Sequence, residues 1–246
     1  MPQLAAKVAL VTGGSRGIGA AIAKHLARGG ADVAITYSSS SDKANAVVDE
    51  IKSSGRRAIA IKADSADPAA VTAAVNRTAV ELGRLDILVN NAGIFAPGAF
   101  EDTSLADMDR MWAVNVRAPI IASQAALKHM AEGGRIINIG SCLAERVPGP
   151  GLTLYAVSKA AIIGLTKGLA RDLGPRGITV NNIEPGPIDT DMNPATGEGA
   201  DEQRSMLATG RYGTPDDIAA MVAFLAADTG RNITGASYLI DGGFAA

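Results

Sequence analysis

The stretch that decides the fold is KVALVTGGSRGIGAAIA, Lys7–Ala23, where a short apolar run leads through a glycine-rich turn into an alanine-rich segment. The run Lys7–Thr12 has the β-branched, apolar character of a buried strand. Glycines at positions 13, 17 and 19 allow a tight turn and a close approach to a ligand. A helix expected from about Ile18 points its unpaired N–H groups and positive dipole end at that ligand. This order is typical of a nucleotide-binding α/β unit, although the glycine spacing differs from the common G-x-G-x-x-G.

The same alternation of strands and helices continues along the chain, without a low-complexity linker or an internal repeat. The strand-like runs are apolar on both faces, which indicates a parallel sheet covered by helices on both sides. We therefore predict one domain over residues 1–246, with a doubly wound, Rossmann-type α/β fold of about seven strands. The predicted strands are Lys7–Thr12, Asp32–Tyr37, Ala58–Asp64, Asp86–Ala92, Arg135–Gly140, Ile178–Ile183 and Ala236–Asp241.

One segment breaks this alternation. Residues 187–213, PIDTDMNPATGEGADEQRSMLATGRYG, are polar and rich in turn-forming residues. An irregular segment of this length inside a compact domain is usually a functional loop. We expect it to be a lid that closes over a bound substrate.

Composition excludes several classes of partner. The formal net charge is −2 and the charges are scattered, so neither nucleic acid nor a membrane surface is an expected partner. No apolar run approaches the roughly 20 residues of a membrane-spanning helix, and the N-terminus lacks the features of a secretory signal, so we expect a cytoplasmic protein. The single cysteine, Cys142, excludes an internal disulfide, and the two histidines have no second ligand pair, so we predict no metal.

The end of the second strand indicates which dinucleotide is bound. An acidic residue there would bind the ribose 2′-hydroxyl and repel a 2′-phosphate. Here the strand ends in TYSS, Thr36–Ser39, which has no carboxylate. Arg16 in the glycine turn has the planar guanidinium that pairs well with a phosphate, and the alternative for it is an ordinary solvated loop residue. The pattern favours NADP(H) over NAD.

A second candidate site is the segment LTLYAVSKAA, Leu152–Ala161, which places Tyr155 and Lys159 one helical turn apart. A phenol titrates near pH 10 in water, so an unassisted tyrosine is a poor acid at neutral pH. On its own, such a pair is more often an ordinary helix face than catalytic machinery.

Further motifs occur in order with this pair: TGGSRGIG at 12–19, NNAG at Asn90–Gly93, IGS at Ile139–Ser141 and PGPIDT at Pro185–Thr190. In this combination the chain resembles the classical short-chain dehydrogenase/reductase family over essentially its whole length. Within that family it looks most like bacterial 3-oxoacyl-[acyl-carrier-protein] reductases and related carbonyl reductases.

The resemblance implies a catalytic tetrad. Tyr155 would be the general acid that protonates the carbonyl oxygen, and Lys159 would lower the tyrosine pKa and bind the nicotinamide ribose. Ser141 would donate a hydrogen bond to the substrate oxygen, and Asn115 would support a water that relays protons to Lys159. The cofactor-binding residues are expected to be Gly13, Ser15, Arg16, Gly17, Ile18, Gly19, Tyr37, Ser38, Asp64, Ser65, Asn91, Ala92, Gly93, Tyr155, Lys159, Pro185, Gly186, Ile188 and Thr190.

The implied function is NADPH-dependent reduction of a ketone, an aldehyde or a 3-oxoacyl carbonyl to an alcohol. Whether an acyl carrier protein is a partner stays open, because Glu132 stands where a basic docking residue would help, while Arg176 is retained. The loop Cys142–Gly151 is one residue longer than is usual in the family. With Glu145, Arg146 and Glu184, it is expected to make the pocket more polar than a fatty-acyl site needs.

Two further expectations follow from resemblance. Family members are commonly homotetramers or dimers, and the C-terminal DGGFAA resembles the tail that such assemblies pack against a neighbouring subunit. The chain also resembles a bacterial subgroup of the same fold described as cyclic-dinucleotide-binding mediators of biofilm dispersal. In that alternative the protein is mainly a binding module, although a pure binding role does not require the intact tetrad.

Overall fold

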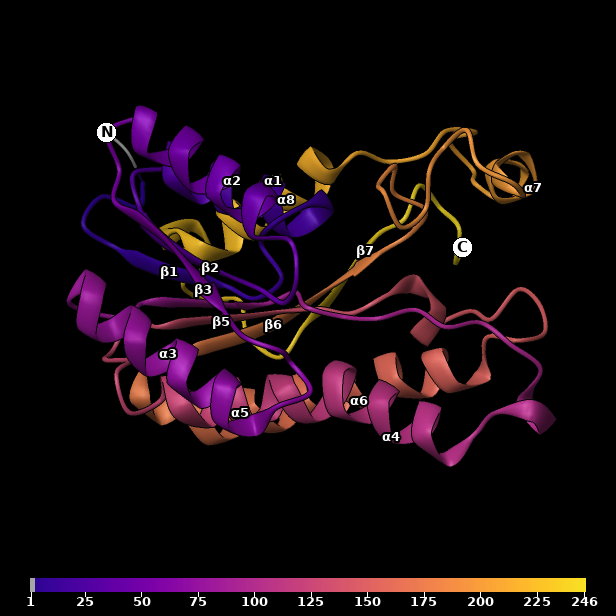
Figure 1. Ribbon diagram of the computed structural model, residues 1–246, viewed down its shortest axis with the longest axis horizontal. Coiled ribbons are helices and arrows are strands. Elements are labelled where there is room, and N and C mark those ends of the chain that lie inside the picture. The colour runs from indigo at the N-terminus through magenta and orange to yellow at the C-terminus, as the bar shows by residue number, and fades with distance from the viewer. Residues whose placement is uncertain (1–2) are drawn as a thin grey trace.

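In the computed structural model, which describes residues 3–246, seven strands form one parallel sheet in the order β3-β2-β1-β4-β5-β6-β7 (Figure 1). The strand order reverses between β1 and β4. Strands β2 and β3 lie on one side of β1, and strands β4 to β7 lie on its other side. In open parallel sheets, ligands bind at this reversal, outside the carboxyl ends of the strands. The strands are β1 Val8–Val11, β2 Asp32–Tyr37, β3 Ala58–Lys62, β4 Ile87–Asn90, β5 Arg135–Ile139, β6 Thr179–Pro185 and β7 Ser237–Ile240.

Helices cover both faces of the sheet. In Figure 1, α1, α2 and α8 lie above the sheet, and α3, α5 and α6 lie below it. The predicted doubly wound α/β fold is therefore confirmed. The helices are α1 Gly17–Arg28, α2 Ser41–Ser53, α3 Pro68–Leu82, α4 Leu105–Trp112, α5 Ala118–Ala126, α6 Thr153–Leu173, α7 Ala200–Ser205 and α8 Pro215–Ala226.

Strand β1 shows why the sheet is apolar on both faces. Ala9 and Val11 belong to the core under α1 and α8, whereas Val8 and Leu10 belong to the core above α3 and α5. Successive side chains of a strand point to opposite faces, so a strand covered on both sides must be apolar at every position.

The predicted strands agree with the observed ones to within a few residues, and β6 differs most instructively. It continues through Glu184 and Pro185, where the prediction ended at Ile183. Glu and Pro are unfavourable in strands, which is why the pattern stopped early. Pairing with β7, where Glu184 lies opposite Leu239, overrides that local preference.

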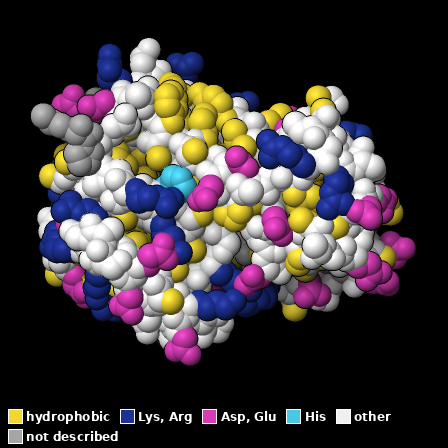
Figure 2. Space-filling model, turned by 90° about the horizontal axis from the view of Figure 1, so that it is seen from above, with side chains coloured by type: hydrophobic (Ala, Val, Ile, Leu, Met, Phe, Trp, Pro, Cys, Tyr) yellow, Lys and Arg dark blue, Asp and Glu magenta, His cyan; other side chains and the backbone are white. Residues whose placement is uncertain are grey.

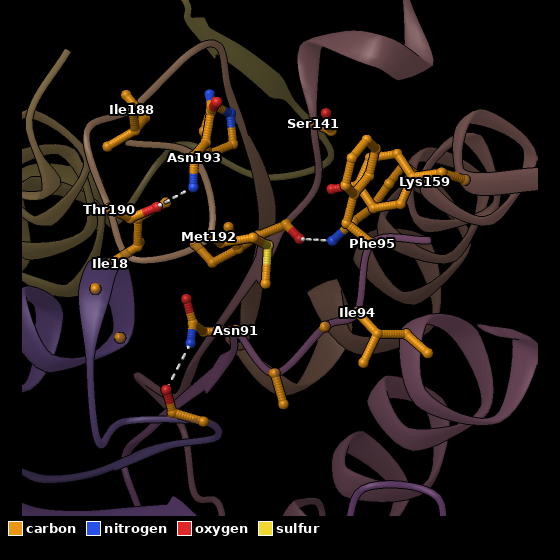
Figure 3. Close-up of a pocket in the computed structure, with 18 of the residues that line it drawn as sticks. Ile18, Asn91, Ile94, Phe95, Ser141, Lys159, Ile188, Thr190, Met192 and Asn193 are labelled. Carbon is orange, nitrogen blue, oxygen red and sulfur yellow. Dashed lines mark hydrogen bonds between the residues drawn. The ribbon is translucent and has the colours of Figure 1, made fainter. Parts of the chain in front are cut away.

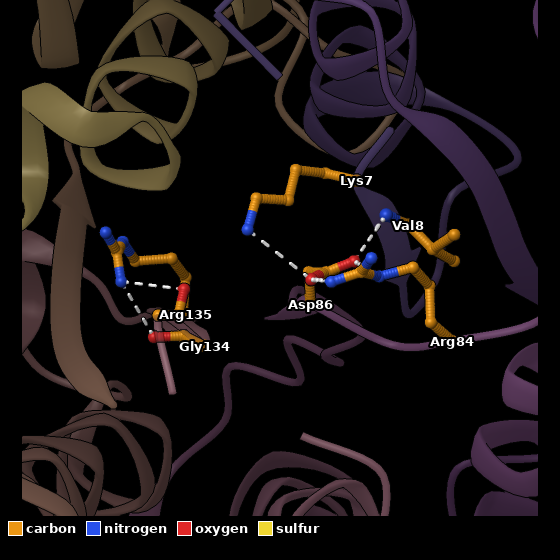
Figure 4. A network of polar contacts seen from close by, with 7 residues as sticks. Lys7, Val8, Arg84, Asp86, Gly134 and Arg135 are labelled. Atoms are coloured by element: carbon orange, nitrogen blue, oxygen red, sulfur yellow. Dashed lines mark hydrogen bonds and ion pairs between the residues drawn. The ribbon is translucent and has the colours of Figure 1, made fainter. Parts of the chain in front are cut away.

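A buried carboxylate joins β1 to β4 (Figure 4). Asp86, which is 7% exposed, accepts hydrogen bonds from the Val8 backbone N–H at 2.9 Å and from the Arg84 guanidinium at 2.8 and 2.6 Å. The Lys7 ammonium lies 3.5 Å from the same carboxylate. The cluster precedes both strands, so it lies at the opposite end of the sheet from the strands' carboxyl ends and serves stability.

Replacing Asp86 with Ala is expected to lower the free energy of unfolding by about 2–4 kcal/mol, because the Val8 N–H and the Arg84 guanidinium lose a buried partner. Urea denaturation measures this change. Asp102→Ala, at an exposed position, is the matched control and should change stability by less than about 0.5 kcal/mol. Equal stability of the two variants would contradict a structural role for Asp86.

The surface is mixed in charge. On the face seen in Figure 2, positively and negatively charged side chains are interspersed rather than gathered by sign. Within residues 3–246, no helix has both the length and the apolar character to cross a membrane. The same residues contain no group of three or more His, Cys, Asp or Glu side chains placed to hold a metal ion.

Candidate active site

A cavity lies at the carboxyl ends of the strands, where the strand order reverses. Its volume is about 520 Å³, within the usual range for a small-molecule site. It is lined by the glycine turn after β1, the ends of β2 and β3, the segments after β4, β5 and β6, and the start of α6. Elements far apart in the sequence therefore meet at one site.

The glycine turn is shaped to bring backbone close to a ligand. Gly13 has a φ of +65°, and a Cβ at Gly19 would lie 2.3 Å from the Gly13 carbonyl oxygen and 2.5 Å from Asn91 Nδ2. Asn91 Nδ2 donates to the Thr12 and Gly13 carbonyl oxygens at 2.9 and 3.1 Å, which ties the exit of β4 to the turn after β1. Helix α1 starts at Gly17, so its unpaired N–H groups face the cavity, as a pyrophosphate site requires.

At the end of β2, no side chain that lines the cavity is a carboxylate. Tyr37 and Ser38 line it, and Thr36 Oγ1 accepts a hydrogen bond from the Gly13 N–H at 3.0 Å. Arg16 also lines the cavity, with 55% of its side chain exposed. These groups fit a dinucleotide with a 2′-phosphate, because they offer a cation and hydroxyl groups and no repelling anion at the strand end.

The predicted catalytic groups meet on one side of the cavity (Figure 3). Lys159, 5% exposed, donates from Nζ to the Ile139 carbonyl oxygen at 2.9 Å. Its Nζ lies 5.7 Å from the centroid of the Tyr155 ring. Phe95 packs edge-on against the same ring, with centroids 4.9 Å apart and planes at 89°. Ser141, 7% exposed, lines the cavity beside them.

The pKa of Tyr155 differs from the expectation. Burial raises it to about 12, and hydrogen bonding with Ser141 only partly opposes that increase. Burial also lowers the pKa of Lys159 to about 8, because the ammonium is held away from water. The expected lowering of the Tyr155 pKa by Lys159 is therefore not seen in the protein alone, where burial is the main cause of the shift and Lys159, with Nζ 5.7 Å from the ring centroid, does not contribute to it.

Asn115 lies behind the cavity, in a single π-helical turn, Ala113–Arg117, of the kind often found at functional sites. Its Oδ1 accepts from the Ile94 N–H at 2.9 Å, and its Nδ2 donates to the Ile94 carbonyl oxygen and to Ser158 Oγ at 3.0 and 3.1 Å. A Cβ at Gly93 would lie 3.4 Å from Asn115 Oδ1 and 3.5 Å from Lys159 Nζ. Asn115 thus shapes the wall next to Lys159, and its water relay stays a prediction.

Ser141 is held by a short turn after β5. Its Oγ accepts from the Leu143 N–H at 3.2 Å, and the backbone at Gly140 packs on Asn182, whose Oδ1 would lie 2.7 Å from an added Cβ. Burial raises the pKa of the neighbouring Cys142 thiol to about 12. Cys142 therefore stays a thiol and packs as a small apolar side chain.

Residues 187–213 form the opposite wall. The segment is anchored by a bridge between Ile188 and Gly213 and by a tight turn from Thr190 to Asn193. The side-chain amides of Asn193 and Gln203 bond to each other in both directions, at 3.0 and 3.3 Å. In Figure 3 the labelled side chains of this segment face Ser141, Phe95 and Lys159 across the cavity; they are Ile188, Thr190, Met192 and Asn193.

The cavity is less polar on its substrate side than expected. Glu145, Arg146 and Glu184 do not line it. Glu184 is 1% exposed and accepts from Asn182 Nδ2 at 2.8 Å, while Arg146 bonds to the Phe244 carbonyl oxygen and stacks over its ring. Because β6 extends through Glu184, this side chain points into the packed interior rather than into the cavity.

The sequence missed several apolar residues of this wall. Phe95 lies two residues after the NNAG motif, so its position was detectable, but Phe244 carries no local signal. The C-terminal tail folds back on its own chain, and Phe244, 3% exposed, lines the cavity instead of extending outward. The further apolar wall residues are Ile94, Val114, Leu143, Pro148, Leu152, Met192 and Met206.

All the residues predicted to bind a cofactor lie around this one cavity, together with three of the four predicted catalytic residues, and Asn115 lies directly behind it. Arg176 does not take part. It donates to the Leu127 and Met130 carbonyl oxygens after α5, at 2.9 and 3.1 Å.

Comparison with known proteins places this site in a family. The family model described as enoyl-(acyl carrier protein) reductase matches residues 13–245. A crystal structure of a short-chain dehydrogenase from Burkholderia cenocepacia J2315 in complex with NADP is 63% identical, with a TM-score of 0.98, and the match covers 99% of this chain and 100% of that one.

Two curated relatives are also similar over almost their whole lengths. The cyclic-di-GMP-binding biofilm dispersal mediator protein of Escherichia coli (strain K12) is 46% identical over 246 residues, 100% of both chains. The 3-oxoacyl-[acyl-carrier-protein] reductase FabG of Staphylococcus aureus (strain Mu50) is 42% identical, over 96% of this chain and 97% of that protein. The chain therefore belongs to the short-chain dehydrogenase/reductase family of oxidoreductases.

Proposed function

We propose that the protein is an NADPH-dependent reductase that converts the carbonyl of a ketone, an aldehyde or a 3-oxoacyl compound to an alcohol. The observation that carries this proposal is the convergence of Tyr155, Ser141 and Lys159 on the cavity that also contains the glycine turn. A proton donor and a dinucleotide site in one cavity suit a reaction that adds a hydride and a proton to the same bond.

In this proposal the nicotinamide cofactor, when bound, supplies the hydride. The N-terminus of α1 and the glycine turn would hold its pyrophosphate, and Arg16 would pair with the 2′-phosphate. Asp64 and Ser65, which line the cavity, would contact the adenine, and Ile188 and Thr190 would contact the nicotinamide end. The segment 187–213 acts as a lid over substrate and cofactor.

Tyr155 then acts as the proton donor. A pKa of about 12 keeps its hydroxyl protonated at neutral pH, so the proton is present when the substrate carbonyl arrives. Ser141 donates a hydrogen bond to the same carbonyl oxygen and holds it against Tyr155. The positive charge of Lys159 favours the tyrosinate that forms as the proton leaves, which is where its effect is largest.

The walls suggest what kind of carbonyl compound enters. The substrate side is formed largely by apolar side chains, including Phe95, Leu143, Met206 and Phe244. Such a chamber favours an apolar body next to the reacting carbonyl. A carrier protein is a less favoured partner, because the Arg176 guanidinium already donates hydrogen bonds to two backbone carbonyl oxygens after α5.

The pH dependence of reduction follows from Lys159. Its ammonium is charged below a pKa of about 8, so kcat/KM for reduction should be constant below that pH and fall as pH rises through it, at most about tenfold per pH unit. Tyr155, with a pKa of about 12, stays protonated between pH 6 and 10, so it adds no further change of rate over that range. Initial rates from pH 6 to 10, with circular dichroism as a check on folding, measure the profile. A rate constant that holds its value to pH 10 would contradict the role of the charge.

The proposed activity is tested with a panel of ketones, aldehydes and 3-oxoacyl thioesters, each assayed with NADPH and with NADH. We expect turnover of at least one apolar carbonyl class, faster with NADPH. A clear preference for NADH throughout would show that Arg16 and the end of β2 do not select the 2′-phosphate.

A second candidate function is cyclic-dinucleotide binding, which the name of the Escherichia coli relative favours. Calorimetry with NADPH and with cyclic di-GMP separates the two functions. Tight cyclic di-GMP binding together with no turnover on the carbonyl panel would favour the binding module. NADPH binding and turnover, with no cyclic di-GMP binding, would favour the reductase.

We also propose that the protein works as a homo-oligomer in the cytoplasm. Leu105 and Trp112 on α4 and Val157 on α6 are 78%, 50% and 54% exposed. Apolar side chains exposed on two adjoining helices are typical of subunit contacts. Light scattering gives the oligomeric state, and a monomer would contradict the proposal.

A further inference from the structure

A lysine and an aspartate next to the glycine turn form a charge cluster with Arg16. Asp191 lies in the segment 187–213, and Lys43 lies on α2. Asp191 Oδ2 is 2.8 Å from Lys43 Nζ and 3.8 Å from Arg16 Nη1. One carboxylate oxygen therefore binds two cations, one of which lines the cavity next to the end of β2.

Asp191 is held in this place by the fold. The neighbouring Thr190 packs on the glycine turn, with its Cγ2 3.5 Å from where a Cβ on Gly17 would lie. A backbone turn from Thr190 to Asn193 fixes the direction of the chain. Lys43, and then Arg16, lower the pKa of the Asp191 carboxyl below its usual value, so it is ionised at neutral pH.

Lys43 is placed where its charge adds to an existing positive potential. It is the third residue of α2, a helix of 13 residues that starts just after the end of β2. A lysine in the first turn does not compensate the helix dipole but adds to its positive end. Asp42, also in the first turn of α2, forms no ion pair with Lys43 within residues 3–246, so Asp191 is the carboxylate that pairs with Lys43.

We propose that Lys43 is a second cation for the 2′-phosphate of the cofactor, and that Asp191 occupies Lys43 and Arg16 until the phosphate replaces it. Arg16, Lys43 and Asp191 together carry one net positive charge, and a phosphate monoester carries about 1.5 to 2 negative charges near pH 7. A dinucleotide without this phosphate leaves the Asp191 contacts in place. The cluster thus selects the phosphate and links its arrival to release of the segment 187–213.

This inference rests on the proposed NADP(H) site, and it is tested by binding rather than by turnover. Dissociation constants for NADPH and NADH are measured by nicotinamide fluorescence, at low salt and at 0.5 M salt. At 0.5 M salt the Debye length is on the order of a few ångström, so interactions between exposed charges are strongly weakened. The variants are Lys43→Gln and Asp191→Asn. Their matched controls are Lys52→Gln, exposed near the other end of α2, and Glu198→Gln, exposed in the segment 187–213.

Lys43→Gln should weaken NADPH binding about two- to fivefold at low salt, as expected for an exposed ionic contact. Asp191→Asn should tighten NADPH binding by a similar factor, about two- to fivefold, because the competing anion is gone. NADH binding should stay within the change seen for the controls, and both effects should shrink at 0.5 M salt, where charges are strongly screened.

Other results overturn the inference. If both variants weaken NADPH and NADH alike, the Lys43–Asp191 pair only fastens the segment 187–213 to α2. If Lys43→Gln leaves NADPH binding unchanged, Lys43 is not a phosphate ligand. Failure of the unaltered protein to bind NADPH would overturn the NADP(H) site itself, and with it both proposals.

Discussion

Tyr155→Phe should abolish nearly all carbonyl reduction, with a loss of about 10²- to 10⁴-fold in kcat, and leave cofactor binding within about twofold. The substitution removes only the hydroxyl that carries the transferred proton. The edge-on contact with Phe95, at 4.9 Å between centroids, involves the ring and is available to phenylalanine. The wall of the cavity should therefore keep its shape while the proton donor is lost.

The control for this experiment is Tyr238→Phe on β7, which removes a tyrosine hydroxyl outside the lining of the cavity. It should retain the activity of the unaltered protein. Turnover is followed by the loss of NADPH absorbance, and cofactor binding by fluorescence. If Tyr155→Phe kept more than about a tenth of the activity, another group would have to be the proton donor.

Lys159→Met should abolish activity and at the same time stabilise the fold. The ammonium is 5% exposed, makes no ion pair within residues 3–246 and has a pKa of about 8. A free lysine titrates near 10.4, and each unit of difference corresponds to about 1.4 kcal/mol, so the charge costs the folded state on the order of 3 kcal/mol at pH 7. Methionine loses the hydrogen bond to Ile139, worth about 1 kcal/mol, and a net gain of about 1–2 kcal/mol remains.

The pH dependence of this difference identifies its origin. Below pH 8 the lysine is protonated in both the folded and the unfolded chain, so its full cost is present. Above about pH 10.4 it is neutral in both states and the cost is gone. The stability advantage of Lys159→Met in urea denaturation should therefore be largest at pH 7 and disappear as pH rises towards 10.4. A variant that is less stable than the unaltered protein at pH 7 would show that the buried charge is compensated in the folded state.

Features that depend on residues close in the sequence were predictable. The glycine turn follows from the steric limits on a few backbone torsions, and the placing of Tyr155 and Lys159 on one helix face follows from the helical repeat. The strands of the sheet follow from runs that are apolar on both faces. At Glu184 and Pro185 this local rule failed, because pairing with β7 decided where β6 ends.

The character of the site depended on residues far apart in the sequence. Phe244 reaches the cavity only because the C-terminal tail folds back, and Asp191 meets Lys43 across 148 positions of the chain. The pKa of Tyr155 rises because several segments pack around its ring. The sequence by itself determined the family and the fold, and it predicted the catalytic and cofactor-binding residues, because short motifs and local periodicity encode them. Only the tertiary structure decided the protonation of those residues, the apolar wall and the charge cluster at Arg16, because burial and electrostatic neighbours are set by packing.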